Sequence, residues 1–244
     1  MTEFNSDRDP YEGSTATRRE TVTELYDNYF STRFGFDARR DLVWKEVVRW
    51  LQNRYIPPDS RVLDLGAGYC NFVNNVIARE KHAVDVFTRF PSFAAPDVIT
   101  HVSSVTSMEF FEDSTFDVAF ASNLFEHLNR PDLLMLLREM RRILKPGGLL
   151  ILMQPNFKYC SETYFDDYTH IQIFTDASLY DFLEAYGFAI RDAFPKFMPV
   201  NMKSTLRLNL PMLPLIVRTY LSMPFKPFAG QMLMVARNTK SKDE

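Results

Sequence analysis

The most informative pattern in the chain is Arg61-Val62-Leu63-Asp64-Leu65-Gly66-Ala67-Gly68-Tyr69-Cys70. Apolar residues lead into an acid, then into two glycines one residue apart, and a helical run is predicted from Asn71 to Arg79. Glycine has no Cβ, so such a turn can take open dihedrals and let a ligand approach its backbone. The pattern predicts a nucleotide-type pocket where the carboxyl end of a strand faces the free N–H groups of a helix.

The spacing of glycines and acids indicates which ligand this turn binds. The dinucleotide fingerprint requires a third glycine where this chain has Asn71. Asp64 instead stands two residues before the first glycine, and a carboxylate there suits an ammonium or sulfonium group and repels a pyrophosphate. The next predicted strand ends near Asp85, about 20 residues further on, the offset at which a carboxylate meets ribose hydroxyls. A cationic ligand that carries a ribose indicates S-adenosylmethionine.

Two further motifs follow in order. The chain reads FDVAFASNLFEHL over residues 116–128 and RILKPGGLLIL over residues 142–152. Together with residues 61–70, they resemble the class I S-adenosylmethionine-dependent methyltransferases, whose fourth strand ends in a similar "leu-glu-his" turn. The chain departs from the family at Cys70, where a third glycine is usual, and at residues 101–106, where many members carry an acid near the adenine.

The resemblance implies a fold, a cofactor and a set of contacts. The fold is α/β: a doubly wound, Rossmann-like seven-stranded sheet with an antiparallel last strand, N-terminal helices over the pocket, and a cap between the last two strands. The activity is that of a methyltransferase (EC 2.1.1.-) with S-adenosylmethionine as cofactor. The acids and glycines of the first loop hold the amino acid end, Asp85 holds the ribose, and the residues after strand four line the floor. The implied cofactor-binding residues are Tyr29, Asp64, Gly66, Ala67, Gly68, Asp85, Val86, Ser104, Val105, Asn123 and Leu124.

The order of elements along the chain predicts its organisation. Residues 1–17 are a polar arm, residues 18–56 form the N-terminal helices, and residues 57–240 form the methyltransferase domain. Strands are predicted near 61–65, 82–87, 97–103, 116–122, 149–153, 188–194 and 231–237. Helices are predicted after Pro131 and from Thr175 or Asp176 to Tyr186. About 35 residues separate the last two strands, and residues 196–228 are the predicted cap, which is rich in proline and apolar residues.

Composition limits the classes of function. Apolar residues make up 46% of 244 residues, the net charge is −3, and the two cysteines are far apart, as in a reduced cytoplasmic protein. No signal peptide or membrane-spanning run is visible. The acidic balance, with no aromatic-basic motif and no Asp-Pro-Pro-Tyr stretch, weighs against a nucleic acid substrate. No His, Cys and acid cluster has metal-ligand spacing, so we expect no metal.

Two histidines are candidates for acid–base chemistry. His127 follows strand four, where it either reaches the acceptor or holds the turn beside the cofactor. His170 lies in a segment expected to overhang the pocket, where Asp166 or Asp167 could orient its imidazole. For a hydroxyl acceptor, either histidine would serve as general base. The other two, His82 and His101, are expected to pack or lie at the surface.

The acceptor is predicted from the cap. Residues 193–240 carry seven basic residues and no acid. Apolar area with cations suits a phosphate-bearing or lipid-linked saccharide at a membrane surface. The leading acceptor is therefore a hydroxyl of a sugar, lipid-linked saccharide or natural product. Peripheral membrane contact and a homodimer seam are both open for this surface. Two alternatives remain: transfer to a carbon or nitrogen of a small metabolite, and a non-catalytic domain that binds a partner.

Overall fold

The chain divides into two compact units, residues 1–36 and 37–244. The computed structural model describes residues 28–29, 35–200 and 212–241. The predicted arm, most of the first predicted helix, and Lys203 and Arg207 of the predicted cap lie outside the described residues. Tyr29 belongs to the first unit, so its cofactor contact stays a prediction. Everything below concerns the second unit.

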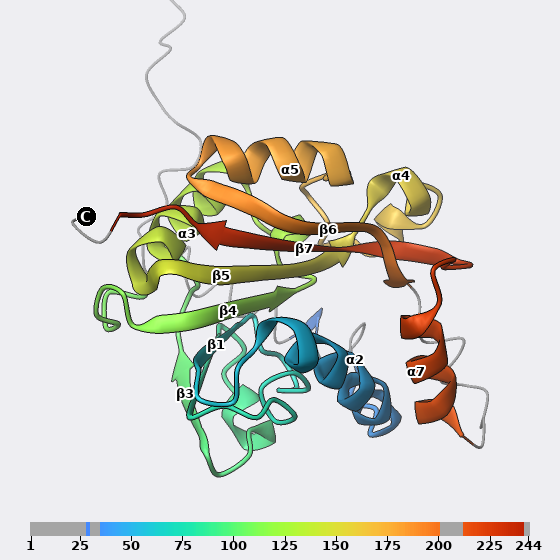
Figure 1. The fold of residues 1–244 in the computed structure, drawn as a ribbon, viewed down its shortest axis with the longest axis horizontal. Coiled ribbons are helices and arrows are strands. Elements are labelled where there is room, and N and C mark those ends of the chain that lie inside the picture. The colour runs from blue at the N-terminus through green and yellow to red at the C-terminus, as the bar shows by residue number, and fades with distance from the viewer. Residues whose placement is uncertain (1–27, 30–34, 201–211, 242–244) are drawn as a thin grey trace, which may run out of the picture. The chain divides into compact units, whose positions relative to one another are not determined.

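A seven-stranded sheet forms the centre of this unit, in the order β3-β2-β1-β4-β5-β7-β6 (Figure 1). Strands β1 to β5 pair in parallel, and β7 is antiparallel to both β5 and β6. The strand order reverses between β1 and β4, the switch point where doubly wound sheets bind ligands. The predicted fold class is confirmed. The strands are β1 (Arg61–Leu65), β2 (Glu80–Asp85), β3 (Val98–Val102), β4 (Phe116–Ser122), β5 (Leu144–Pro155), β6 (Phe188–Pro199) and β7 (Ala229–Asn238).

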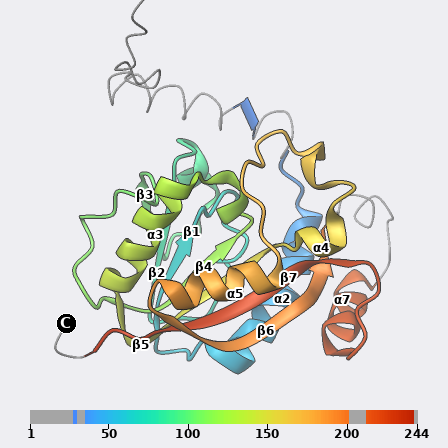
Figure 2. The same ribbon diagram turned by 90° about the horizontal axis from the view of Figure 1, so that it is seen from above.

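Helices cover both faces of the sheet (Figure 2). Strand β4 shows why, because its side chains alternate between the faces. Phe120 meets Trp44 of α2 edge to face at 6.0 Å, whereas Ala119 and Ala121 belong to the core that α3 and α5 close. The helices are α2 (Arg39–Tyr55), α3 (Arg130–Ile143), α4 (Phe157–Cys160), α5 (Asp176–Ala185) and α7 (Leu213–Ser222), with short 3-10 turns η1 (Phe90–Phe93), η2 (Phe125–His127) and η3 (Tyr164–Asp166). Among the described helices, none is long and apolar enough to cross a membrane.

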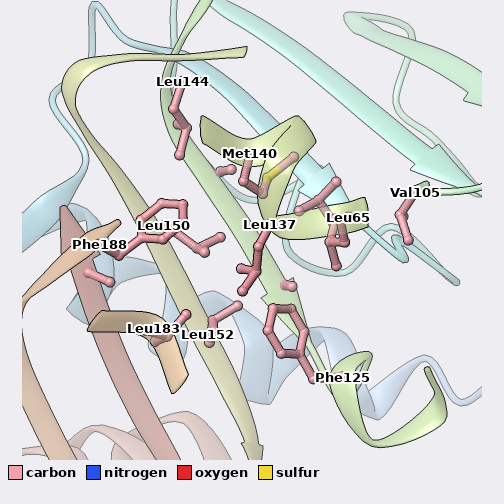
Figure 3. Packing of buried hydrophobic residues seen from close by; sticks show 14 of the residues in the cluster. Leu65, Val105, Phe125, Leu137, Met140, Leu144, Leu150, Leu152, Leu183 and Phe188 are labelled. Atoms are coloured by element: carbon pink, nitrogen blue, oxygen red, sulfur yellow. The ribbon is translucent and has the colours of Figure 1, made fainter. Parts of the chain in front are cut away.

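Helix α3 supplies the centre of the main core. Its start is capped by the Asn129 side chain, which accepts the Asp132 N–H at 2.9 Å. Figure 3 shows Leu137 and Met140 among side chains of β1 and β5. Each such side chain contributes about 1.5–3 kcal/mol on full burial. The buried residues of α3 are Leu133, Leu136, Leu137, Met140 and Ile143.

The prediction of a helix from Asn71 to Arg79 is wrong. Residues 68–75 form consecutive turns, and residues 76–78 have no regular structure. Asparagine side chains explain this, because they compete for backbone partners. Asn74 donates to the Phe93 carbonyl and accepts from Ala95 N–H, both at 2.8 Å, and Asn75 donates to Asp41. The loop is therefore tied to η1 and α2 rather than wound into a helix.

Two strands begin or end away from their predicted limits. Strand β5 starts at Leu144 and includes Gly147 and Gly148, which were expected to lie before it. Gly148 fits there because a Cβ would lie 3.0–3.2 Å from the carbonyl oxygens of Lys145, Asp117 and Phe116. Strand β6 continues to Pro199, into the predicted cap.

Helix α7 lies in the predicted cap and packs against α2. Arg218 donates to both oxygens of the buried Glu46 carboxylate at 2.9 and 3.0 Å. Lys226 donates to the carbonyl oxygens at the end of the same helix, with 2.8 Å to Leu221. Two of the basic residues predicted to face an anionic surface are thus engaged within the protein.

Candidate cofactor site and the adjoining acid–histidine cluster

The glycine loop folds over the end of β2. The N–H groups of Gly66 and Ala67 both point at the Val84 carbonyl, at 2.9 and 3.3 Å. Gly66 and Gly68 take positive φ values of 65° and 52°, which residues with a Cβ adopt at a cost. The Gly68 N–H then donates to Asp85 Oδ2 at 2.7 Å. The loop is thereby closed onto the acid predicted to hold a ribose.

Two buried carboxyl groups lie under this loop. Asp85 is 6% exposed, and its Oδ1 accepts the Phe87 N–H at 2.8 Å. Burial raises the pKa of Asp85 to about 6, and backbone N–H groups partly oppose the rise. Asp64 is 3% exposed, and burial holds its pKa well above the usual range although the Val73 N–H favours the ionised form. Asp85 raises the Asp64 pKa further. Such a pair favours a cationic ligand.

Residues after β4 close the loop from the other side. A Cβ at Gly66 would lie 3.1 Å from Leu124 Cδ1, so Leu124 sits directly against the glycine loop. Asn123 has a φ of 51°, and its N–H donates to the Met153 carbonyl at 2.8 Å. Gln231 of β7 donates to Asn123 Oδ1 at 3.0 Å. No sequence pattern indicates a role for Gln231, which lies 108 residues further along the chain than Asn123.

The remaining predicted cofactor residues follow β2 and β3. Val86 is half-buried beside Asp85. Ser104 pairs its hydroxyl with that of Thr106 at 2.8 Å. Val105 belongs to the hydrophobic core and is 6% exposed. Cys70 stands at a φ of 58°, which explains why glycine is usual at this position, and burial raises the pKa of its thiol.

A second group of titratable residues lies at the end of β4. Three side chains meet there: Glu126 and His127 of η2, and His170 of the loop after η3. Each offers one nitrogen or oxygen atom that could bind a metal ion, and these atoms lie within 4.8 Å of one another. We call these three residues the Glu-His-His cluster. The Ile171 and Gln172 N–H groups donate to the Glu126 carbonyl oxygen at 2.9 and 3.0 Å, which fixes the loop against η2.

Glu126 is an unusual member of this cluster. The residue is 1% exposed, and neither carboxylate oxygen accepts a hydrogen bond from another described residue. Its own backbone N–H is the one group that favours its charged form. Burial, with a smaller contribution from Asp167, raises the pKa of Glu126 to about 8. Buried polar groups are almost always hydrogen-bonded, so this one calls for an explanation.

Both imidazoles are held through Nδ1. His170 Nδ1 lies 2.7 Å from the Tyr164 carbonyl oxygen. His127 Nδ1 lies 2.9 Å from Thr169 Oγ1, and Thr169 in turn donates to Asp167 Oδ1 at 2.6 Å. Asp167 therefore acts on His127 through Thr169, in addition to the orienting role expected for it at His170. Burial, and to a lesser degree His170, lowers the pKa of His127 to about 4.

The structure brings most of the predicted site together at one edge of the sheet. Asp64, Gly66, Gly68 and Asp85 converge with Leu124, and His127 and His170 lie with their ring centroids 5.0 Å apart. His82 is buried and stacks on His101 with ring centroids 5.4 Å apart, a packing role as expected.

A cavity of about 800 Å³ opens elsewhere. It is lined by Ser60, Asp117, Lys145 and Gly148 among others. These residues lie at the amino ends of β1 and β4 and in the first part of β5, so the cavity faces away from the glycine loop. The buried acids, rather than this cavity, mark the candidate ligand site.

The chain was compared with known families and proteins. A family model described as a methyltransferase domain matches residues 36–193. A probable methyltransferase of Aspergillus luteorubrus, ltbC, is 35% identical over 77 residues, which cover 31% of this chain and 27% of that protein. The match thus spans about a quarter of that relative's length.

Solved structures share the fold at low identity. A S-adenosylmethionine-dependent methyltransferase from Archaeoglobus fulgidus has a TM-score of 0.56 at 20% identity, over 88% of this chain and 99% of the other. The [4+2]-cyclase SpnF has a TM-score of 0.62 at 18% identity, over 91% and 97%. At these identities the likeness concerns the fold.

The sheet order, with the glycine loop and two buried acids at the ends of β1 and β2, defines a doubly wound α/β protein. The family match assigns it: the chain belongs to the methyltransferase domain family, in the S-adenosylmethionine-dependent class I. S-adenosylmethionine is the cofactor of this class.

Proposed function

We propose that this protein transfers a methyl group from S-adenosylmethionine to a hydroxyl of a small molecule, with a sugar, a lipid-linked saccharide or a natural product as acceptor. One observation carries the cofactor part: two buried acids, Asp64 and Asp85, converge under a glycine loop that sits on the second of them. A ligand with ammonium and sulfonium charges relieves the buried carboxylates, and a ribose gives Asp85 two hydroxyl donors.

The proposed cofactor contacts follow from these positions. Asp64, Gly66, Ala67 and Gly68 hold the amino acid end, and Asp85 with Val86 holds the ribose. Ser104 and Val105 lie toward the adenine, and Asn123 and Leu124 form the floor. Tyr29 would cover the methionine end. With S-adenosylmethionine bound, the sulfonium supplies an electrophilic methyl group and a neutral leaving group, and the residues of the chain must align the acceptor and exclude water.

The acceptor would enter beside the Glu-His-His cluster. That cluster follows β4 directly after Asn123 and Leu124, so a group bound there adjoins the cofactor floor. His170 is the better general base of the two predicted histidines, because the pKa of His127 is lowered to about 4. A base with so low a pKa is a poor proton acceptor at neutral pH. With the cofactor bound, His170 would accept the proton of the hydroxyl group as the acceptor oxygen is methylated.

The composition of the cap favours membrane contact, but the contacts of its basic residues weaken that prediction. Arg218 is bound to Glu46 and Lys226 to backbone carbonyls, so neither faces a headgroup without losing these partners. The apolar side chains Leu215, Ile216, Phe225 and Phe228 are exposed, which suits either a lipid surface or a dimer seam. Flotation with anionic vesicles at low salt separates the two: binding supports lipid contact, and a dimer that ignores vesicles supports the seam.

Titration calorimetry tests the cofactor assignment. We expect the wild type to bind S-adenosylmethionine and Asp85→Ala to bind at least about 100-fold more weakly, because two charge-assisted hydrogen bonds of about 1.5–3 kcal/mol each are lost. Asp97→Ala removes an exposed acid that is paired with Lys81 and is the matched control. No binding by the wild type, or equal binding by all three proteins, would end the assignment.

A second function stays open because the methyltransferase fold also occurs in a protein named as a cyclase. A domain that binds the cofactor without transferring its methyl group would pass the titration. Incubation with methyl-labelled cofactor and pools of saccharides, sugar nucleotides and phenols distinguishes the two. Label in any acceptor supports the transferase, and binding without transfer across all pools supports a non-catalytic role.

A further inference from the structure

The Glu-His-His cluster has a composition that its position in a methyltransferase does not require. A hydroxyl acceptor needs one base, whereas here a carboxylate and two imidazoles come together within 4.8 Å. They come from two separate segments, η2 and the loop after β5. The two backbone hydrogen bonds from residues 171 and 172 to the Glu126 carbonyl hold these segments together. The arrangement is therefore built into the fold rather than left to side-chain mobility.

The carboxylate of Glu126 has its oxygens directed at no donor of another described residue, although the side chain is 99% buried. An ionised carboxylate in such surroundings costs several kcal/mol unless a cation or several donors accompany it. A protonated carboxyl would still leave its O–H and its second oxygen without partners. A bound cation satisfies both oxygens at once.

The two imidazoles are prepared as ligands. The Tyr164 carbonyl can only accept, so His170 carries its proton on Nδ1 and keeps a lone pair on Nε2. The Thr169 hydroxyl gives its proton to the Asp167 carboxylate, so it accepts from His127 Nδ1–H, and His127 Nε2 also keeps a lone pair. Metal-bound histidines characteristically donate their other N–H to a carbonyl or, as here through a hydroxyl, to a carboxylate.

We infer that Glu126, His127 and His170 form a binding site for one divalent metal ion. Two imidazole nitrogens and a carboxylate favour Zn²⁺ or a first-row transition ion such as Mn²⁺ over Mg²⁺, which prefers oxygen ligands. Three protein ligands leave coordination positions open to solvent or substrate. This inference runs against the expectation from the sequence, where positions 126, 127 and 170 show no metal-ligand spacing.

The proposed ion would also change the chemistry at the acceptor, and this part alone rests on the proposed function. An acceptor oxygen on an open position loses its proton more readily, because the cation stabilises the alkoxide. The proton passes to solvent, the oxygen forms a bond to the methyl carbon, and the carbon–sulfur bond breaks. The products are the methyl ether and S-adenosylhomocysteine. His170 then acts as a ligand, and the ion replaces it as the group that favours deprotonation.

Metal titration tests the site without reference to activity. Tag-free protein is stripped with chelator, the chelator is removed, and Zn²⁺ and Mn²⁺ are titrated by calorimetry. We expect one Zn²⁺ per chain and a Tm that rises on Zn²⁺ addition. His170→Gln should bind Zn²⁺ at least about tenfold more weakly, with an unchanged Tm before Zn²⁺ is added. His101→Gln, in the other histidine pair, should bind Zn²⁺ as the wild type does.

Glu126→Gln provides a second variant, which keeps the shape of the side chain and removes its charge. Its Zn²⁺ affinity should fall as that of His170→Gln does. Failure of the wild type to bind Zn²⁺ or Mn²⁺, or equal binding by the wild type and both variants, would overturn the inference. The proposed function fails separately: a protein that binds Zn²⁺ and no S-adenosylmethionine keeps the metal site and loses the transferase. Methyl transfer unaffected by chelation would overturn the role given to the ion.

Discussion

Two acidic sites at the same edge of the sheet are built in different ways. At the end of β2, Asp85 accepts N–H groups from Gly68 and Phe87 at 2.7 and 2.8 Å. At the end of β4, Glu126 is as deeply buried and accepts none from another described residue. Both carboxyl groups have a raised pKa from burial, so burial alone does not distinguish them. The difference is the supply of backbone donors from other residues: Gly68 and Phe87 donate to Asp85, whereas Glu126 has only its own N–H among the described donors.

The contrast indicates what each site requires from a ligand. Asp85 is already solvated by the protein and needs only hydroxyl donors to complete its shell, which suits a ribose. Among the described residues, none donates a hydrogen bond to the Glu126 carboxylate from another position, and such a group suits a bound cation. The hydrogen bonds to Asp85 are thus present without a ligand, whereas the Glu126 carboxylate would gain its partner from the proposed cation.

The largest effect should come from breaking the glycine loop. Gly66→Ala would introduce a Cβ at a position whose φ is 65°, and that Cβ would lie 3.1 Å from Leu124 Cδ1. Strain of about 1–2 kcal/mol, added to the contact with Leu124, should weaken S-adenosylmethionine binding more than tenfold. Titration calorimetry provides the measurement.

Gly147→Ala is the matched control for this change. Its φ of 78° carries the same kind of strain, and a Cβ there meets nothing within 4 Å. Gly147 also lines the cavity that faces away from the loop. We expect Gly147→Ala to lower the Tm and leave cofactor affinity unchanged. Equal losses of affinity in both variants would show that the loop contributes only through overall stability.

The next largest effect should be a pH dependence of cofactor binding. Burial raises the pKa of Asp85 to about 6, so the carboxylate that accepts the ribose hydroxyls becomes protonated as the pH falls through about 6. Cofactor affinity should therefore fall about tenfold between pH 7 and pH 5. Asp64, whose pKa is also raised, acts in the same direction, because protonation removes the charge that attracts the cation.

Calorimetry between pH 5 and pH 7 measures this dependence in the wild type and in Asp85→Asn. Asp85→Asn should bind weakly at every pH and lose most of the dependence, while Zn²⁺ binding at the Glu-His-His cluster remains measurable at pH 7. An affinity for S-adenosylmethionine that stays flat from pH 5 to 7 in the wild type would contradict the role given to Asp85.

The smallest effect concerns the stability of the ligand-free protein. The raised pKa of Asp64 costs stability at pH 7, because the buried carboxyl gives up its proton less readily in the folded state than in the unfolded state, where the reference pKa is 3.8. Asp64→Asn removes that cost, and we expect a Tm rise of about 2–4 °C, corresponding to about 1 kcal/mol, with weaker cofactor binding. The gain should shrink as the pH falls and disappear below 3.8, where the carboxyl is protonated in both states.

Asp97→Asn is the counterpart, since Lys81 holds the pKa of Asp97 below its usual value. That substitution should give no gain in Tm at pH 7. A Tm rise of equal size in both variants would mean that removing any negative charge stabilises the protein, and that burial of Asp64 has no separate effect.

The meeting of the glycine loop with the two strand-end acids could be predicted from the sequence because its determinants are local. Asp64, Gly66 and Gly68 lie within five residues, and the end of β2 is marked by Asp85 after an apolar run. A parallel sheet then brings the two strand ends together without further information. The prediction failed at residues 71–79, where helical spacing was present but Asn74 and Asn75 form hydrogen bonds to other segments.

The Glu-His-His cluster could be predicted only in part. The sequence indicates His127 and His170 as separate candidate bases, from their positions after the fourth and fifth strands. Their meeting depends on the hydrogen bonds from residues 171 and 172 to Glu126, which no periodicity indicates. Glu126 itself was seen only as part of a family motif, because burial without a donor is a property of the packed structure. The same holds for the Arg218–Glu46 pair, formed across 172 residues.

The contact between Gln231 and Asn123 has a consequence for biosynthesis. Strand β7 lies in the sheet between β5 and β6, and its Gln231 donates to Asn123 in the loop proposed as the cofactor floor. A nascent chain on the ribosome carries the glycine loop and both buried acids long before residue 231 has been made. We therefore expect ribosome-bound chains that stop before β7 to lack cofactor binding, so that S-adenosylmethionine can stabilise this protein only after β7 has been synthesised.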